Sequence, residues 1–350
     1  MILPLQTARL TLRALAATDT PVITAYRNDP AVARFQDWDL PVTAEATVAH
    51  VERHSRVTGP AVGKWVQIGI EYEGELAGDL AVGLDDTGRI ATIGYTLRQD
   101  RQRLGIAREA VAALVDTLFE QLDVHLVTAT LDPLNVASAR LLEDLGFRYE
   151  GRGKAAALVR GSWEDDDRYA LLRDDRETWL GRPTGKPAQV ELVEITPSNV
   201  GKVARLATHH SQERFVAPMA ISFMDALVPE LFDGEPAVPW LRAIAADGEL
   251  VGFLMIAEVS ATVPEPYLWR LLIDRRHQRR GIGARAVELL TEHVRREGAR
   301  GLTVSWAEGP GGPEPFYRKL GFVPTGEIED GETVARLDLA DAGGGNSATT

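Results

Sequence analysis

Gln102-Arg103-Leu104-Gly105-Ile106-Ala107 recurs 176 residues later as Gln278-Arg279-Arg280-Gly281-Ile282-Gly283. In both places an apolar segment precedes the hexapeptide and an amphipathic segment follows it. A glycine at the start of a helix lets several backbone N–H groups point toward one place, where the helix dipole favours negative charge. The hexapeptide therefore predicts a strand, a phosphate-binding loop and a helix, and it predicts them twice.

Two further signatures repeat at nearly the same offset. The segment 74–78, Gly-Glu-Leu-Ala-Gly, recurs 174 residues later as Gly-Glu-Leu-Val-Gly, and Leu-Gly-Phe at 145–147 recurs at 320–322. Three signatures in the same order indicate two copies of one domain. We expect the copies at 1–180 and 189–340, joined by a Gly- and Pro-rich linker at 181–188, with a flexible tail at 341–350.

Composition narrows the class of protein. The chain has 350 residues, of which 45% are hydrophobic and 25% charged, which suits two globular domains. It has no cysteine, which excludes a disulfide framework, a thiolate metal site and a cysteine nucleophile. A net charge of −13 argues against nucleic acid as the main partner, because phosphate groups bind to Lys and Arg. The same negative charge favours a partner that carries an amine. The sequence also lacks a long apolar run, so we expect no membrane partner and a cytoplasmic protein.

Each copy predicts the same order of elements. In the first copy we expect strands at 10–15, on both sides of 73–74, at 90–97 and at 126–130, and helices from an N-cap at Thr20, after Gly105 and at 136–145. In the second copy we expect strands at 190–195, on both sides of 247–248, at 267–273 and at 302–306, and a helix at 283–295. Each half is thus α/β (α+β type), with a mostly antiparallel twisted central sheet flanked by helices.

The loop differs from two familiar phosphate-binding patterns. It has neither the Gly-Lys-Ser/Thr of nucleoside triphosphate sites nor the Gly-x-Gly-x-x-Gly of dinucleotide sites. Gln-x-x-Gly-x-Gly/Ala between a strand and a helix, with Leu-Gly-Phe about forty residues later, resembles the GNAT superfamily of N-acetyltransferases. This resemblance covers nearly the whole chain, once per half. It implies two tandem GNAT domains, with acetyl-CoA as the donor and no metal.

The two halves resemble different branches of that superfamily. The first half, with its segments 8–13, 28–30, 93–95 and 135–142, is similar to the ribosomal-protein N-terminal acetyltransferases. The second half, with 212–218, 314–322 and 325–328, is similar to bacterial spermine/spermidine acetyltransferases. Where that second branch usually has asparagine, this chain has Met219.

The resemblance implies which residues bind the donor. The two loops would hold its pyrophosphate, and a bulge in the preceding strand would leave a backbone N–H for the thioester oxygen near Leu97 in the first half and near Leu272 or Ile273 in the second. The donor-binding set is Leu97, Gln102, Arg103, Leu104, Gly105, Ile106, Ala107 and Asn135 in the first half, and Leu272, Ile273, Gln278, Arg279, Arg280, Gly281, Ile282 and Gly283 in the second.

The resemblance also suggests catalytic residues. Tyr317, five residues before the Phe of Leu-Gly-Phe, would protonate the departing thiolate, and Ser138 is its counterpart in the first half. Glu213 is ranked first among the carboxylates that would act as base or bind the acceptor, ahead of Glu265. The first half has Thr92 where its branch commonly has a glutamate.

Three functions follow from these observations. The first is acetylation of a small amine, such as a polyamine, a metabolite or an antibiotic, chiefly by the second half. The second is protein N-terminal acetylation by the first half. In the third, one half is a non-catalytic domain that binds CoA or stabilises the pair. A monomer with pseudo-dimeric halves is the expected assembly. His50 and His54 have the spacing of a zinc site, but no third ligand is evident, so a surface helix is expected there.

Overall fold

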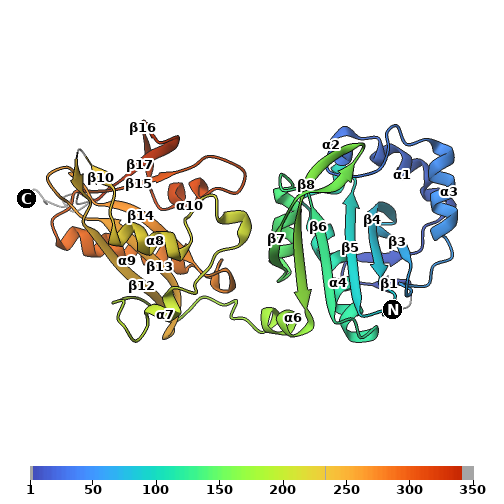
Figure 1. Cartoon of the computed structure of the whole chain (residues 1–350), viewed down its shortest axis with the longest axis horizontal. Coiled ribbons are helices and arrows are strands. Elements are labelled where there is room, and N and C mark those ends of the chain that lie inside the picture. The colour runs from blue at the N-terminus through green and yellow to red at the C-terminus, as the bar shows by residue number, and fades with distance from the viewer. Residues whose placement is uncertain (1–2, 233, 341–350) are drawn as a thin grey trace, which may run out of the picture. The chain divides into compact units, whose positions relative to one another are not determined.

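Figure 1 shows the chain in a computed structural model that describes residues 3–232 and 234–340. The chain divides into two compact units, Met1–Gly181 and Arg182–Thr350. We call them the N-terminal and C-terminal domains and describe each by itself. The tail expected at 341–350 lies outside the described residues.

The N-terminal domain contains an eight-stranded sheet with the order β1-β2-β3-β4-β5-β6-β8-β7. Only β5 and β6 pair in parallel among these strands. The strands are β1 (Leu5–Gln6), β2 (Leu10–Arg13), β3 (Trp65–Tyr72), β4 (Glu75–Leu84), β5 (Ile90–Leu97), β6 (Leu126–Leu131), β7 (Arg148–Val159) and β8 (Ser162–Leu172). The helical segments are η1 (Ala17–Asp19), α1 (Thr20–Arg27), α2 (Pro30–Ala33), α3 (Ala44–His54), η2 (Gln99–Arg101), α4 (Ile106–Gln121), α5 (Val136–Asp144) and α6 (Arg173–Leu180).

The C-terminal domain repeats this plan with a seven-stranded sheet of order β16-β17-β15-β14-β13-β12-β9, in which only β14 and β15 are parallel. Its strands are β9 (Val190–Val193), β12 (Pro239–Ala246), β13 (Glu249–Ala257), β14 (Tyr267–Ile273), β15 (Gly301–Trp306), β16 (Val323–Glu329) and β17 (Glu332–Asp338), with β10 (Leu231–Phe232) and β11 (Glu235–Pro236) forming a separate pair. The helical segments are α7 (Val200–Val203), η3 (His210–Gln212), α8 (Met219–Leu227), η4 (Arg275–His277), α9 (Ile282–Arg296) and α10 (Glu314–Lys319).

Helices cover both faces of the C-terminal sheet. On β13, Leu254 and Ile256 join the core that α9 and α10 complete, whereas Phe253 and Met255 join the core that includes α7 and α8. Successive residues of a strand point to opposite faces, so the near-continuous apolar sequence of β13 is explained by burial on both sides. The fold class expected from the sequence is confirmed, with two mixed sheets flanked by helices.

The two parallel strands of each domain separate toward their carboxyl ends. The parallel register of β5 and β6 ends at Thr92 and Thr128, although β5 continues to Leu97. The parallel register of β14 and β15 joins only Tyr267 to Thr303 and Leu268 to Val304. Each sheet therefore opens at the end of the strand that leads into the glycine loop.

A bulge interrupts β14 but not β5, and it lies at Trp269, three residues before the position expected near Leu272 or Ile273. In β14 the register against β13 skips Trp269, so that Trp269 packs into the core shared with α8 and the next residue, Arg270, also reaches Asp225 of α8. Two neighbouring side chains on one face require an extra residue in the strand. The prediction of a bulge near Leu97 is wrong, because β5 keeps one register with β4 throughout and its side chains alternate without interruption.

Glycines of the repeated 74–78 and 248–252 segments allow the strands to approach closely at this point. A Cβ atom on Gly78 would lie 2.1 Å from the carbonyl oxygen of Thr96, and one on Gly252 would lie 2.6 Å from that of Leu272. No larger residue fits either place without moving the strand backbone. The glycines of this repeated segment thus let β4 and β13 pack closely against β5 and β14, the strands that lead into the two loops.

One helix start differs from the expectation. The N-cap of α1 is Asp19, not Thr20, and the short turn η1 precedes it. The carboxylate of Asp19 is buried and accepts hydrogen bonds from Arg13 and from the backbone N–H of Ala16. This network holds Asp19 at the N-cap position, so the helix begins at Thr20, one residue earlier than a cap at Thr20 would give.

Candidate active site

The two glycine loops have the same backbone conformation. Arg103 and Gly105 have φ angles of 61° and 77°, and Arg279 and Gly281 have φ angles of 62° and 79°. Each glycine is the N-cap residue of the following helix, α4 or α9, in the left-handed region that glycine adopts without strain. In both domains the N–H groups of the loop and of the first helical turn are thus directed toward one anion-binding place.

The glutamine of each loop secures the loop to the preceding strand. The side-chain amide of Gln102 donates to the carbonyl oxygen of Leu97 at 3.2 Å, and that of Gln278 donates to Ile273 at 3.1 Å. Gln278 also donates to the side chain of Gln212 at 2.8 Å. The sequence grouped these glutamines with ligand-contacting residues, but their side chains orient the loop by binding its own strand.

The surroundings of the two loops differ. In the N-terminal domain, Arg9 donates to the carbonyl oxygen of Leu104 at 3.1 Å, and its guanidinium lies 3.3 Å from where a Cβ on Gly105 would be. Arg9 is held there by Glu109 of α4 at 2.7 Å. A Cβ on Gly281 would meet nothing within 4 Å, so the second loop leaves more room beside its glycine.

Other loop residues contribute mainly their backbone. Ile106 and Ile282 are buried, whereas Leu104 is exposed. Gly283 lies against Phe316 of α10, at 3.3 Å from a notional Cβ, so this position needs a small residue. The side chain of Arg280 is also buried; it donates to the carbonyl oxygen of Gly185 at 2.7 Å and contacts His277 at 3.0 Å.

Tyr317 lies beside the opening between β14 and β15. Its ring stacks on Trp306, the last residue of β15, and packs edge-on against Phe322. Burial, together with nearby Tyr267 and Glu332, raises the pKa of the Tyr317 phenol above its ordinary value. A neutral phenol that keeps its proton at pH 7 has the character required of a general acid.

Tyr267, Ser305 and Glu332 form a hydrogen-bonded chain next to Tyr317. The hydroxyl oxygens of Tyr267 and Ser305 lie 2.7 Å apart, and the Ser305 hydroxyl donates to the Glu332 carboxylate. Sequence reasoning missed all three residues because they belong to β14, β15 and β17, and no sequence spacing connects them.

The first domain has a different arrangement of hydroxyl groups. Ser138 of α5 lies 2.6 Å from the hydroxyl of Tyr95 on β5, and burial raises the pKa of Tyr95. Asn135 caps α5 by accepting the backbone N–H of Ser138 at 3.2 Å. Thr92, where a glutamate was expected, is 3.1 Å from Thr128 across the last parallel pair. Tyr95 was not predicted as a site residue, although its Ile-Gly-Tyr segment contributed to the resemblance.

A short segment connects the two sides of the C-terminal opening. Gln212 accepts the hydrogen bond from Gln278, in the loop after β14, and Arg214 donates to the carbonyl oxygen of Pro310 at 2.6 Å, in the loop after β15. Glu213 lies between these two contacts, with 47% of its side chain exposed and His210 at 2.9 Å. Glu265, the second carboxylate considered, is instead bound through both oxygens to Arg336 at 2.7 Å.

The two histidines of α3 belong to a buried polar cluster. His50 contacts Arg27 at 3.1 Å, and the rings of His50 and His54 are 4.9 Å apart. Arg27 lies 3.9 Å from Asp79, which is buried and bonded to the Tyr26 hydroxyl. The helix itself lies at the surface, as expected, with Glu52 and Arg53 exposed, and His54 lies on its buried face at 6% exposed. Among residues 3–232 and 234–340 no group of three side chains could hold a metal ion.

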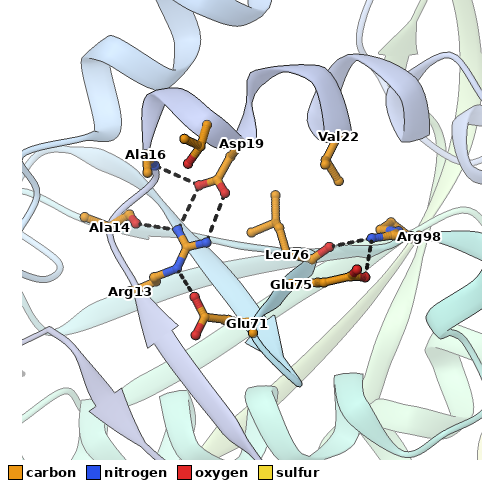
Figure 2. Close-up of a pocket in the computed structure, with 11 residues that line it drawn as sticks. Arg13, Ala14, Ala16, Asp19, Val22, Glu71, Glu75, Leu76 and Arg98 are labelled. Atoms are coloured by element: carbon orange, nitrogen blue, oxygen red, sulfur yellow. Dashed lines mark hydrogen bonds and ion pairs between the residues drawn. The ribbon is translucent and has the colours of Figure 1, made fainter.

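A pocket of about 690 Å³ opens in the N-terminal domain between η1, α1 and the turn that joins β3 to β4 (Figure 2). Arg13 lies between Asp19 and Glu71, at 2.8 Å and 2.6 Å. Arg98, which follows β5, pairs with Asp100 at 2.9 Å and Glu75 at 3.5 Å. These arginines and carboxylates bind one another, so the pocket is stabilised internally and we assign it no ligand.

Both domains match a known family. Residues 9–148 match the family described as "Acetyltransferase (GNAT) domain", and residues 204–322 match that described as "Acetyltransferase (GNAT) family". In the part of the chain that the structure describes, none of the helices has the length and apolar character of a membrane span.

Individual relatives cover parts of the chain. The probable N-acetyltransferase YjcK of Bacillus subtilis (strain 168) is 39% identical over 87 residues, which are 25% of this chain and 48% of that protein, so the chain spans about half the length of this relative. The ribosomal protein uS5-alanine N-acetyltransferase of Escherichia coli (strain K12) is 34% identical over 83 residues, 24% of this chain and 43% of that protein. A solved structure, RimJ of Mycobacterium smegmatis in complex with CoA-disulfide, is 26% identical with a TM-score of 0.40, covering 47% of this chain and 83% of that one. The N-terminal half resembles the ribosomal-protein acetyltransferases among such relatives.

Proposed function

Since the chain consists of two domains of the GNAT acetyltransferase family, we propose that it transfers acetyl from acetyl-CoA to the primary amine of a small molecule, chiefly through its C-terminal domain. The observation that carries this proposal is the position of Tyr317, a buried phenol beside the opening between β14 and β15. The sequence resemblance of segments 212–218, 314–322 and 325–328 to polyamine acetyltransferases is the reason to propose a polyamine or another amine-bearing metabolite as acceptor. For domain limits we propose 1–180 and 189–340, with 181–188 as linker.

Donor binding in the C-terminal domain rests on the loop. The backbone N–H groups of residues 279–283 would bind the pyrophosphate of acetyl-CoA, with Arg279 adding positive charge. Arg280 would contribute only its backbone, because its side chain is bound to Gly185 and His277. Backbone near Leu272 and Ile273 would receive the thioester oxygen. In the N-terminal domain, residues 102–107 with Leu97 and Asn135 form the corresponding set.

The reaction requires a neutral amine, an oxyanion donor and an acid for the thiolate. The neutral amine attacks the thioester carbonyl, the C–S bond breaks, Tyr317 gives its proton to sulfur, and the proton that the nitrogen loses on becoming an amide restores the phenol. Proximity of the bound reactants supplies much of the rate enhancement, and a covalent enzyme intermediate is not required. Glu213 lies between two contacts that connect the loops after β14 and β15, which supports a role in binding a cationic acceptor.

Protein N-terminal acetylation by the first domain is the second candidate function. It is favoured by the likeness of this half to ribosomal-protein acetyltransferases and by the Ser138–Tyr95 pair, in which either hydroxyl could protonate a thiolate. Thr92 instead of a carboxylate, and Arg9 beside the loop, favour a domain that binds CoA without catalysis.

Thiol release from acetyl-CoA separates these functions. The full chain is assayed against polyamines, aminoglycosides, amino acids and peptides that carry free N-termini. We expect turnover with at least one small amine and its loss in Tyr317→Phe. Turnover with peptides alone, retained in Tyr317→Phe and lost in Ser138→Ala, would instead assign the activity to the N-terminal domain.

A further inference from the structure

The hydrogen bonds in the Tyr267, Ser305 and Glu332 chain have a defined direction. Because the Ser305 hydroxyl donates to the Glu332 carboxylate, its proton is not available to Tyr267. Tyr267 must therefore donate to Ser305 across the 2.7 Å that separate their oxygens. The phenolic oxygen of Tyr267 keeps a lone pair that can accept a proton from outside the chain.

The hydrogen-bonded chain of Tyr267, Ser305 and Glu332 lies where the sheet opens between β14 and β15. Tyr267 belongs to the first of the two parallel pairs between β14 and β15, and Ser305 directly follows the second. Ser305 and Trp306 are neighbours on β15 and so point to opposite faces. Trp306 stacks on Tyr317 in the core that contains α9, whereas Tyr267 packs against the core that contains α8. This hydrogen-bonded chain and the Tyr317 ring thus approach the opening from opposite faces of the sheet.

Among the charged groups around the hydrogen-bonded chain, Glu332 is the one placed to accept a proton from Ser305. Arg270 is near enough to lower the pKa of Tyr267, but burial is the largest effect and raises it, and the charges of Glu332 and Glu329 act in the same direction. Arg270 is itself paired with Asp225 of α8 at 2.9 Å. From the loop after β15, Glu308 accepts from Thr333 at 3.2 Å. Of these carboxylates, only Glu332 accepts from Ser305.

We infer that Glu332, through Ser305 and Tyr267, is the base that removes the proton from the ammonium group of the acceptor. The ammonium gives a proton to the Tyr267 oxygen, Tyr267 passes its own proton to Ser305, and Ser305 passes its proton to Glu332. The ammonium becomes a neutral amine and the carboxylate becomes a carboxylic acid, so charge and protons balance. This inference rests on the proposed acetylation of amines. It assigns the role of base to Glu332 in place of Glu213, which is exposed and paired with His210.

The test compares two small amines with the full-length protein. The nitrogen of 1,3-diaminopropane is protonated at neutral pH and must lose a proton before it attacks, whereas hydroxylamine is neutral. In Glu332→Gln the hydrogen bond from Ser305 is retained but the acceptor of the proton is lost. We expect kcat/KM for the diamine to fall by about 10²-fold at pH 7, and the loss to shrink as the pH approaches about 10, where the amine loses its proton unaided. With hydroxylamine the loss should stay within about threefold.

Further variants separate the possible outcomes. Ser305→Ala removes the hydroxyl that connects Tyr267 to Glu332 but keeps the carboxylate, so it should reproduce the pattern of Glu332→Gln. The matched control is Glu327→Gln, an exposed carboxylate on the neighbouring strand β16, which should leave the rates with both amines and the pH profile unaffected. An equal loss with both amines at every pH, or none with the diamine, would overturn the inference. A wild-type protein that acetylates neither amine, nor any amine of the wider panel, would overturn the proposed function and the inference with it.

Discussion

The ring of Tyr317 lies nearly parallel to the indole of Trp306, with 5.7 Å between their centroids and 12° between their planes. Trp306 ends β15, so this stacking positions the phenol beside the opening between the parallel strands. Tyr317 is only 7% exposed, and Phe316 and Phe322 pack edge-on against it. The ring is therefore fixed by packing alone, and its hydroxyl can be removed without disturbing that packing.

Tyr317→Phe should lower kcat by about 10²- to 10⁴-fold while the KM for acetyl-CoA changes little. The ring stays stacked on Trp306, but no phenol remains to protonate the thiolate. Because burial raises the pKa of Tyr317, the wild-type phenol keeps its proton throughout neutral pH and should cause no loss of activity below about pH 10. Steady-state kinetics across pH measure both effects, and a fully active variant would make Tyr317 a packing residue only.

Gln278→Met should raise the KM for acetyl-CoA without a comparable change in kcat. The side-chain amide donates to Ile273 and Gln212, and methionine fills similar space without donating. Each of the two lost hydrogen bonds contributes about 1 kcal/mol, so the increase in KM should be at most roughly thirtyfold. Gln102→Met is the matched control, since it removes the equivalent contact to Leu97 in the other domain. Equal effects of both changes would contradict the division of labour between the domains.

The sequence predicts local structure well where the decisive contacts are local. The bounds of β5 and β14 agree with the prediction to the residue, because an alternating or apolar run ends at a loop whose glycine must adopt positive φ. Long-range contacts could not be predicted in this way. Ser305 is 38 residues from Tyr267 and 27 from Glu332 in sequence, and Arg280 is 95 residues from Gly185. The bulge at Trp269 depends on packing against α8, which the sequence of β14 alone does not reveal.

Acid should destabilise the N-terminal domain through His50. Burial, with the positive charge of Arg27, lowers the pKa of His50 to about 3, so the folded domain holds the imidazole neutral. The unfolded chain takes up a proton near pH 6.5 and the folded chain does not. Stability due to this group is therefore present above about pH 6.5 and is lost as the pH falls toward 3.

His50→Gln should reduce this dependence on pH. Urea unfolding followed by circular dichroism at several pH values gives the slope of the unfolding free energy, to which one proton adds at most about 1.4 kcal/mol per pH unit, and less for a partly exposed group. His54, whose pKa burial also lowers, should retain part of the effect. The matched change at exposed His125 is the control. A slope that is the same in wild type and His50→Gln would exclude His50 as the acid-sensitive group.

The last prediction concerns the two loops. Gly105→Glu and Gly281→Glu put a carboxylate where each loop would bind phosphate, and both glycines have positive φ, so the backbone strain of the two changes is comparable. The C-terminal domain has Tyr317 beside its opening, whereas the N-terminal domain has Thr92 where a base was expected, and a threonine hydroxyl does not hold a proton taken from an ammonium. We therefore expect Gly281→Glu to abolish acetylation of small amines and Gly105→Glu to leave most of it, while calorimetry shows acetyl-CoA binding lost at one site in each variant. Circular dichroism establishes that both variants fold. Loss of amine acetylation in Gly105→Glu alone would reverse the assignment, and the base would then have to be sought around Ser138 and Tyr95.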